Sequence, residues 1–258
     1  MRLYPLFSSS SGNCYYLGSK TEGFLIDAGS SAKRITAALA ANDIPLTAVK
    51  GIFVTHEHTD HVSALRVLLK RINVPVIGTR GTIAMISNAL SGADLHSFSD
   101  RLEISGALCT GEVKIIKTSH DSAEPCGFRF DFDDSVISFI TDSGVITDDF
   151  GKAFGSGTAV LESNYDPVML RYGTYDARTK ARVAGSQGHL SNKQSGEFAA
   201  LLLKTGTKNI ILAHISEHNN TPETASEAFL AATSGYKNGR DYFLKTLPAV
   251  CEPWFITI

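Results

Sequence analysis

The segment Ile52-Phe53-Val54-Thr55-His56-Glu57-His58-Thr59-Asp60-His61 places three histidines and an aspartate within six residues, directly after an apolar run. In an extended chain alternate side chains share a face, so His56 and His58 point the same way. A helix that begins near Asp60 would present Asp60 and His61 from its first turn. One short loop could therefore supply two ligands to each of two neighbouring ions. Imidazole with carboxylate suits zinc, manganese or iron better than calcium or magnesium.

The alternative for this segment is a solvated, histidine-rich loop. The chain has eight histidines in all, and three of them fall within six residues just after an expected strand. A single motif carries a known risk of a false match. We nevertheless expect a metal site, because such clustering at the end of a buried strand is hard to explain as ordinary surface.

The residues on either side of this segment predict an alternation of strands and helices. Apolar runs indicate strands at Arg2–Phe7, Cys14–Leu17, Phe24–Ile26, Gly51–Val54, Val74–Ile77, Ala159–Leu161 and Asn209–Leu212. Helical spacing indicates helices at Ala32–Ala41, Val62–Ile72, Asn192–Lys204 and Pro222–Ala232, the last with Thr221 as N-cap. A β-meander is expected from about Leu95 to Phe139, with Asp133-Asp134 as the turn between Phe128–Phe132 and Val136–Ile140. This order fits two sheets back to back with helices outside, but composition alone does not exclude a doubly wound sheet.

Composition limits the class of protein. The 258 residues are enough for one large domain or two small ones, and 43% of them are hydrophobic. The formal net charge of −2 means that any nucleic-acid binding must rest on a local patch. The four cysteines, Cys14, Cys109, Cys126 and Cys251, form no C-x-x-C pair, so free thiols in a reducing compartment are expected. No apolar stretch suits a signal peptide or a membrane span, so we expect a cytoplasmic protein with no membrane contact.

Two motifs resemble those of a known family. The segment Thr55–His61 is similar to the H-x-H-x-D-H motif of the metallo-β-lactamase superfamily. Upstream, Phe24–Gly29 resembles the strand of that family that ends in Asp-x-Gly. The resemblance implies a single domain over residues 1–258 with an α/β (α+β) fold, a four-layer αββα sandwich.

The same resemblance implies a full set of ligands. His120, Asp142 and His214 each lie just beyond an apolar run, in the order that the family has. Taken singly, each could be an ordinary polar or turn residue. The resemblance implies one ion held by His56, His58 and His120, a second held by Asp60, His61 and His214, a bridging Asp142, and Asp27 orienting a ligand by hydrogen bonding.

Further stretches narrow the branch. Five stretches resemble the YycJ-like (WalJ-like) bacterial branch, whose members are regarded as DNA exonucleases or hydrolases. They are Ser9–Cys14, Glu124–Phe128, Glu162–Asn164, Gly188–Asn192 and Ile215–Glu223. Tyr165 and His218 depart from that branch's pattern, which leaves the substrate open.

His189 opens an expected helix about 25 residues before His214. A similar arrangement occurs in ribonuclease Z and related phosphodiesterases, where the upstream histidine serves the phosphate or the leaving group. Asn192 and the nearby helix N-terminus would add an anion site. The alternative is a histidine that only caps or packs the helix.

A basic stretch lies at Arg171–Arg182. It holds Arg171, Arg178, Lys180 and Arg182 interleaved with Tyr172 and Tyr175, a combination that suits phosphate contact and base stacking. The alternative is a solvated helix face.

We therefore expect a hydrolase with two divalent ions, Zn²⁺ first and Mn²⁺ or Fe as alternatives, that cleaves phosphodiesters with a metal-bridging hydroxide. Asp60 would orient the hydroxide and accept its proton, and His189 would act on the leaving oxygen. The expected substrate is nucleic acid, DNA rather than RNA. The residues expected to contact it are Ser11, Asn13, Asn192, Arg178, Lys180 and Arg182.

One enzymatic alternative stays open, and two further alternatives are disfavoured. A hydrolase of small esters, thioesters, lactones or cyclic phosphates could use the same ions, and it would not depend on the three cations Arg178, Lys180 and Arg182. A non-catalytic metal-stabilised module usually has an incomplete ligand set, whereas this chain has all seven. A flavodiiron-type redox protein would need a flavin domain, for which there is no room. Sequence does not fix the oligomeric state.

Overall fold

A computed structural model describes residues 1–105, 110–132 and 135–258. Cys109 and the expected turn at Asp133-Asp134 lie outside the described residues. The described chain divides into two compact units. The first comprises Met1–Val113, Ser122–Pro125 and Ala249–Ile258, and the second comprises Lys114–Asp121 and Cys126–Pro248. The single domain over residues 1–258 stays a prediction.

The first unit is built on a seven-stranded mixed sheet in the order β14-β1-β2-β3-β4-β5-β6. The pairs β14–β1, β1–β2 and β2–β3 are antiparallel, and the strands from β3 to β6 are parallel. The strands are β1 Arg2–Ser9, β2 Gly12–Gly18, β3 Gly23–Ile26, β4 Val49–Phe53, β5 Val76–Gly78, β6 Leu95–Ser97 and β14 Ile256–Thr257. Parallel neighbours carry their carboxyl ends to one edge of the sheet. The segment Thr55–His61, which we call the ligand loop because it carries four expected ligands, follows β4 at this edge.

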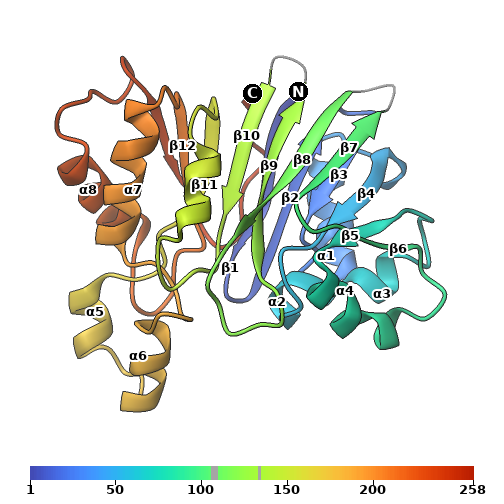
Figure 1. Ribbon diagram of the computed structural model, residues 1–258, viewed down its shortest axis with the longest axis horizontal. Coiled ribbons are helices and arrows are strands. Elements are labelled where there is room, and N and C mark those ends of the chain that lie inside the picture. The colour runs from blue at the N-terminus through green and yellow to red at the C-terminus, as the bar shows by residue number, and fades with distance from the viewer. Residues whose placement is uncertain (106–109, 133–134) are drawn as a thin grey trace. The chain divides into compact units, whose positions relative to one another are not determined.

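Helices join the parallel strands of this unit, as parallel pairing requires (Figure 1). They are α1 Ala32–Ala41, α2 Thr59–Val62, α3 Leu65–Leu68 and α4 Arg80–Ser87, with short 3₁₀ turns η1 Leu46–Ala48 and η2 Asn88–Leu90. The Ser31 side chain caps α1 by accepting a hydrogen bond from Arg34 N. Ile35 and Leu39 of α1 are fully buried and pack into one apolar cluster with strand residues such as Ile52. The apolar stripe of the helix thus fixes it against the sheet.

The second sheet has the order β13-β12-β11-β10-β9-β8-β7. Strands β10 to β13 are parallel, and β9 is antiparallel to β10. The strands are β7 Arg101–Ser105, β8 Thr110–Lys117, β9 Cys126–Phe132, β10 Ser135–Ile140, β11 Thr158–Glu162, β12 Asn209–Ala213 and β13 Phe243–Thr246. β11 and β12 are buried almost throughout, as expected of central parallel strands.

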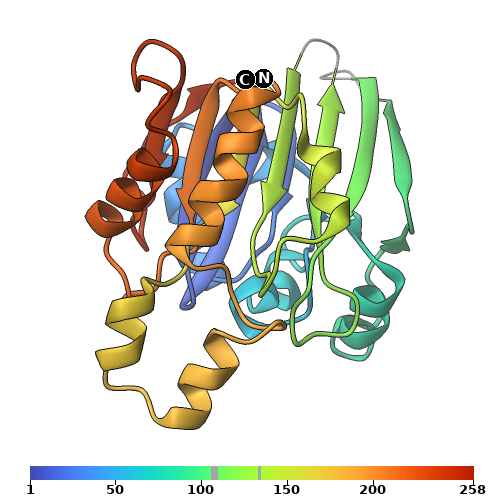
Figure 2. The ribbon, with the colours of Figure 1, turned by 60° about the vertical axis from the view of Figure 1, so that its left-hand side comes forward.

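Helices α7 (Asn192–Lys204) and α8 (Pro222–Ala232) run along β11 and β12 in both ribbon views, Figures 1 and 2. Phe198, Leu202 and Phe229 of these helices share a buried cluster with Leu161 and Leu212. The remaining helices of the unit are η3 Asp148–Ala153, α5 Pro167–Tyr172 and α6 Ala177–Val183. Figure 2 shows α5 and α6 projecting below α7 and α8 as a separate pair.

The expected elements are mostly confirmed, some to the residue. The helices at 32–41, 192–204 and 222–232 have the expected bounds, and the Thr221 side chain caps α8 by accepting from Thr224 N. The expected helix Val62–Ile72 is wrong, because α2 ends at Val62 and α3 covers only Leu65–Leu68. A contact with a distant segment accompanies the interruption: Ala64 N donates to Ala28 O at 2.9 Å instead of extending the helix from α2.

The expected β-meander from Leu95 is also wrong at its start. Strand β6, Leu95–Ser97, belongs to the first sheet, where Ile77 pairs with His96 in parallel register. β6 has only three residues, of which Leu95 is half-buried and the other two are exposed, so it gives no periodic signal that could assign it to a sheet.

Of the cysteines in the described ranges, Cys14 and Cys126 are buried and Cys251 is partly exposed. Burial raises the pKa of the Cys14 thiol well above its usual value, and the nearby Asp27 carboxylate raises it further. Within the described ranges, no helix combines the length and the apolar character that crossing a bilayer requires.

Candidate metal centre

The loop after β4 in the first unit carries four of the seven expected ligands. β4 ends at Phe53, and α2 begins at Thr59 with His58 as its N-cap residue. The His56 ring centroid lies 4.6 Å from that of His58 and 4.0 Å from that of His61. Asp60 Oδ2 lies 3.5 Å from His61 Nε2. The strand–loop–helix path expected from the sequence therefore does bring these four side chains together.

Asp27 organises this loop from the end of the neighbouring strand β3. Its Oδ2 accepts a hydrogen bond from His61 Nδ1 at 2.8 Å, and its Oδ1 accepts one from Thr55 N at 2.9 Å. The Thr55 hydroxyl donates to Asp27 and lies 3.0 Å from His56 Nδ1, from which it accepts. Both histidines thus carry their proton on Nδ1, which leaves Nε2 as the nitrogen that can bind a metal. Asp27 thus contacts an expected ligand, and its role in orienting that ligand for a metal stays a prediction.

Gly29, the last residue of the Asp-x-Gly motif, allows the loop to approach the sheet. A Cβ at this position would lie 1.5 Å from Asp60 O, so no other residue fits without moving the loop. Hydrogen bonds lock the same contact, from Gly29 N to Asn13 O and from Ala28 N to His61 O, both at 2.8 Å. The motif's glycine is therefore required by the position of two expected ligands.

Ser11 and Asn13 have different surroundings. Ser11 is exposed on the turn between β1 and β2. Asn13 is buried, and its Nδ2 lies 3.1 Å from His61 Nε2 and 3.4 Å from Asp60 Oδ2. Asn13 thus lies against two expected ligands. A substrate contact by either residue stays a prediction.

The other three expected ligands lie in the second unit, each after a strand of the second sheet. His120, Asp142 and His214 come shortly after β8, β10 and β12, and all three are buried. Asp142 and His214 have φ values of +57° and +54°, and Asp27 in the first unit has +59°. A left-handed backbone at a residue other than glycine costs about 1 kcal/mol and persists only where the surroundings enforce it. Three of the four such residues in the described chain are expected site residues.

Glu162, the last residue of β11, is the centre of this second cluster. Its Oε1 accepts from His189 Nδ1 at 2.8 Å and from His214 Nδ1 at 2.9 Å. Its Oε2 accepts from Ser143 N and Leu190 N, both at 3.0 Å. Burial alone would raise the pKa of this carboxyl, but the two histidines that donate to it hold its pKa well below the usual value. Glu162 is therefore ionised at neutral pH.

Glu162 lies in one of the stretches that resemble the branch, but the sequence predicts no role for it. The available signal was the one used for the other ligands, since Glu162 directly follows the apolar run Ala159–Leu161. Thr55 is part of the ligand motif, but the sequence predicts no contact for its hydroxyl. No local pattern distinguishes it from an ordinary threonine at the end of a strand.

His120 is held in a similar way. Its Nδ1 donates to Gly188 O at 2.9 Å, and its Nε2 lies 3.9 Å from Asp142 Oδ1. Burial lowers the pKa of His120, and the nearby His189 lowers it further against the opposing effect of Asp142. The neutral imidazole is the form that binds a metal.

The donor atoms in the second unit fit a divalent ion. Asp142, Glu162, His189 and His214 each offer a ligand atom within 4.8 Å of the others. The Nδ1 atoms of both histidines already donate to Glu162, so Nε2 of His214 is the nitrogen suited to a metal. A mixture of imidazole and carboxylate donors, with Nδ1 held by a buried anion, is characteristic of transition-metal sites. The assignment of all seven ligands to two ions stays a prediction.

Asn192 and the α6 cations have partners of their own. Asn192 is buried, and its side chain exchanges hydrogen bonds with Asn220 and accepts one from Ser163. In α6, Lys180 Nζ donates to Arg171 O at 2.9 Å, and Arg182 Nε pairs with Asp121 Oδ2 at 2.7 Å. Arg178 is exposed. The structure thus gives Asn192 a structural role, and substrate binding by Asn192 and these three cations stays a prediction.

Comparisons with known proteins show the family to which the chain belongs. Residues 9–150 match the family model described as the metallo-beta-lactamase superfamily. The chain is 33% identical over 232 residues to a Bacillus anthracis protein named exodeoxyribonuclease YycJ, covering 85% of this chain and 84% of that one. It is also 33% identical over 224 residues to one named exodeoxyribonuclease WalJ from Streptococcus pneumoniae strain D39, covering 85% and 83%.

A solved structure, the metallo-beta-lactamase fold protein YhfI from Bacillus subtilis, has a TM-score of 0.74 to this chain at 14% identity, with 99% of both chains covered. This likeness concerns the fold alone. Together with two mixed sheets and their helices, it confirms the expected α/β fold class of the αββα type.

Replacing Gly29 by alanine should displace the Asp60 backbone, because the added methyl group would occupy the position of its carbonyl. We expect the free energy of unfolding to fall by about 1–3 kcal/mol, typical of overpacking, and bound metal to decrease. Denaturant unfolding and elemental analysis measure the two effects. Gly235→Ala is the matched control, since a Cβ there meets nothing within 4 Å. Equal behaviour of the two variants would contradict the packing argument.

Replacing Glu162 by glutamine keeps the size of the side chain but removes its charge and one of its acceptor atoms. The His214 and His189 rings then lose their shared anchor, and we expect metal affinity to fall about 10- to 100-fold. Competition with a fluorescent chelator gives the affinity. Glu197→Gln, at an exposed residue whose Oε1 lies 3.9 Å from Lys193, is the control. An unchanged affinity in Glu162→Gln would show that Glu162 does not position a ligand.

Proposed function

Because the chain belongs to the metallo-β-lactamase superfamily, we propose that it is a metal-dependent phosphodiesterase that degrades nucleic acid from its ends, with DNA as the preferred substrate. The observation that carries the proposal is the pair of buried carboxylates, Asp27 and Glu162, that hold the Nδ1 of His61 and His214. This arrangement supports ligand histidines rather than ordinary polar ones. The 33% identity to proteins named exodeoxyribonucleases supports DNA as the substrate.

The proposed cofactor is a pair of divalent ions, with zinc expected first. His56, His58 and His120 would hold one, Asp60, His61 and His214 the other, and Asp142 both. Bound ions of this kind lower the pKa of water and offset the charge that develops on phosphoryl oxygens. A count of two metal equivalents per chain by elemental analysis is the direct test of this stoichiometry.

Asp60 is proposed as the residue that orients the attacking water. Its carboxylate is 25% exposed, and it lies beside the buried His61. A carboxylate so placed accepts a hydrogen bond from water and then its proton, and it can release that proton to solvent. The buried carboxylates Asp27 and Glu162 are less suited to this role because their oxygens already accept hydrogen bonds from the protein.

His189 is proposed as the residue that acts on the leaving group. Glu162 fixes its Nδ1 as a donor, so Nε2 is the nitrogen that faces the substrate. When the ring is protonated, Nε2 can donate its proton to the departing oxygen or bind the phosphate. The side chain is 12% exposed, compared with 1% for His214, which supports contact with a substrate. The ring thus combines a fixed orientation with access from solvent.

The organisation of the chain completes the proposal. We propose that residues 1–258 act as one domain in the cytoplasm, without membrane contact. The seven expected ligands are divided between the two units, with four in the first and three in the second. Neither unit alone supplies the proposed set.

Replacing His189 by alanine should leave the metal content unchanged and reduce the rate of DNA hydrolysis about 10²- to 10⁴-fold, the usual contribution of a general acid. Assays on 5′- and 3′-labelled single- and double-stranded DNA and RNA, with metal analysis of the same samples, measure both quantities. His96→Ala, at an exposed histidine paired with Asp94, is the control. Normal turnover by His189→Ala would remove this residue from the mechanism.

The same assays test the function itself. The proposal expects digestion to start at one labelled end and to stop when chelator removes the metal. Wild-type protein that binds metal and cleaves no phosphodiester would refute it.

A further inference from the structure

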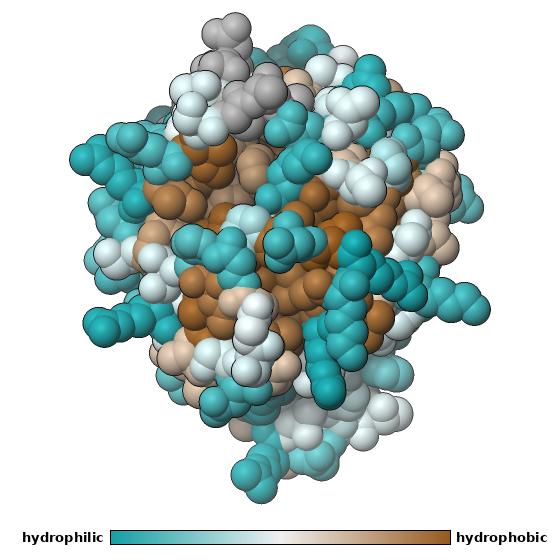
Figure 3. Space-filling model, turned by 90° about the vertical axis from the view of Figure 1, so that its right-hand side faces the viewer, coloured by the Kyte–Doolittle hydropathy of each residue, from teal (hydrophilic) through white to brown (hydrophobic). Residues whose placement is uncertain are grey.

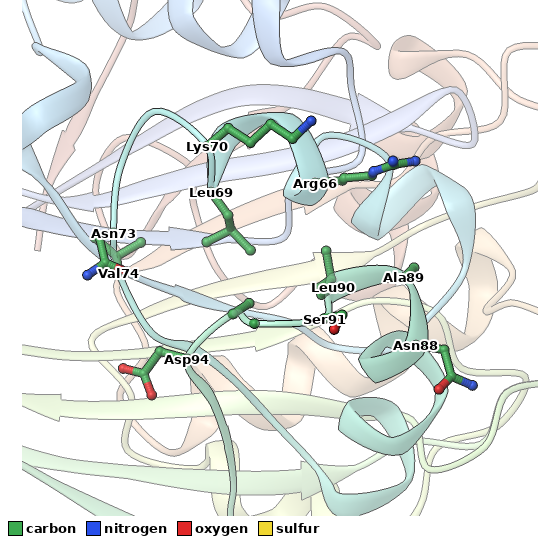
Figure 4. Close-up of a pocket in the computed structure, with 12 residues that line it drawn as sticks. Arg66, Leu69, Lys70, Asn73, Val74, Asn88, Ala89, Leu90, Ser91 and Asp94 are labelled. Atoms are coloured by element: carbon green, nitrogen blue, oxygen red, sulfur yellow. The ribbon is translucent and has the colours of Figure 1, made fainter.

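A surface of the first unit beside the ligand loop contains two adjoining cavities. One, of about 370 Å³, begins at Glu57 and Thr59, which flank His58, and extends to Met85 and Leu90. The other, of about 530 Å³, lies over α3 and η2 (Figure 4). Arg66, Ala89 and Leu90 line both. The two cavities therefore adjoin at these three residues and together extend from the ligand loop along the surface. We call this pair of cavities the α3 track.

The α3 track combines free positive charge with apolar surface. Arg66 and Lys70, four residues apart, are exposed, and neither takes part in a hydrogen bond or an ion pair within the described part of the chain. In Figure 4 they lie on one side of the cavity, while Leu69 and Leu90 point toward each other across its middle. Met85 in the adjoining cavity is 59% exposed. Figure 3, which shows the side where α3 and α4 lie in Figure 1, has apolar residues gathered among hydrophilic ones.

Two acidic residues, Asp94 and Glu57, also line the α3 track. Asp94 Oδ1 pairs with His96 Nε2 at 2.7 Å, and Glu57 Oε1 accepts from Ala123 N at 2.8 Å. Within the described chain no ion pair joins either carboxylate to Arg66 or Lys70, and Figure 4 shows Asp94 on the opposite side of the cavity from both cations. The side of the track that holds the two cations can therefore contact an anion that also carries apolar groups.

We propose that the α3 track binds a single strand of nucleic acid next to the ligand loop. Phosphates would contact Arg66 and Lys70, and unpaired bases would lie against Leu69, Leu90 and Met85. Accessible base faces favour a single strand, because a duplex presents mainly its phosphates while its bases stay stacked inside. This inference rests on the proposed nuclease function, which provides a reason for a strand to lie beside His58.

The track differs from the basic stretch of α6 in one respect. The α6 cations Lys180 and Arg182 contact Arg171 O and Asp121, whereas Arg66 and Lys70 are available to a ligand. Counterion release then gives a measurable signature, since each phosphate contact to a single strand contributes about 0.7 to the slope of log K against log salt.

The test is binding of a 5′-fluorescein 12-nucleotide phosphorothioate DNA strand to the metal-loaded protein, followed by anisotropy at several salt concentrations. Arg66→Ala/Lys70→Ala should weaken binding about tenfold at low salt and reduce the salt slope by about 1.4, the contribution of two contacts. Met85→Ser should weaken binding without changing the slope. Lys33→Ala/Lys50→Ala, which removes two exposed cations of the same unit, is the control and should bind as the wild type does. Hydrolysis of bis-p-nitrophenyl phosphate should be the same in all variants, because this diester has a single phosphate and none of the further ones that would contact Arg66 and Lys70.

Several outcomes would overturn the α3 track. They are an unchanged slope in Arg66→Ala/Lys70→Ala, an equal loss in the control, or displacement of the strand by an acidic peptide as efficiently as by unlabelled DNA. Equal affinity for a duplex would also overturn it. Strand binding that depends on Arg66 and Lys70, in a protein without nuclease activity, would support the α3 track and refute only the proposed function. Nuclease activity together with an unchanged salt slope in Arg66→Ala/Lys70→Ala would support the proposed function and refute only the α3 track.

Discussion

A buried carboxylate that holds the Nδ1 of a histidine is the interaction on which both halves of the candidate site depend. Removing a carboxylate from water is costly unless its oxygens find donors. Asp27 receives donors from Thr55 and His61, and Glu162 receives four, two imidazoles and two backbone N–H groups. With these donors the anions stay ionised, and the histidines that donate to them are fixed in tautomer and direction.

The backbone is arranged to meet this requirement. Asp27, Asp142 and His214 each leave a strand in a left-handed conformation, which turns the side chain sharply at the strand's end. Gly29 lets the Asp60 carbonyl approach to a distance that no Cβ would permit. The same contact draws Ala64 N to Ala28 O and divides the helix that follows the ligand loop. A left-handed backbone at three residues and a divided helix thus accompany the arrangement of the expected ligands.

The division of labour between the two units follows from their sheets. Each has parallel strands whose carboxyl ends reach one edge, and the polar residues of the site follow those ends. The first unit contributes the dense ligand loop, and beside it the α3 track with its two free cations. The second contributes three expected ligands that are widely separated in the chain, and the residues that contact them. Loops at the ends of central strands can vary while the buried strands keep their register, which suits the proposed combination of fixed metal ligands with adaptable substrate contacts.

The sequence by itself determined the strands before Asp27 and His56, the helices at 32–41, 192–204 and 222–232, and the residues of the ligand loop. These depend on neighbours within a few positions, so periodicity, capping residues and a dense motif suffice to predict them. Only the tertiary structure decided the role of Glu162, whose partners His189 and His214 lie 27 and 52 residues away. Only the tertiary structure also showed that Asn192 hydrogen-bonds to Asn220, that the helix after the ligand loop is divided, and that β6 belongs to the first sheet. Each of these results from contacts between segments distant in the chain, and a local pattern carries no record of such contacts.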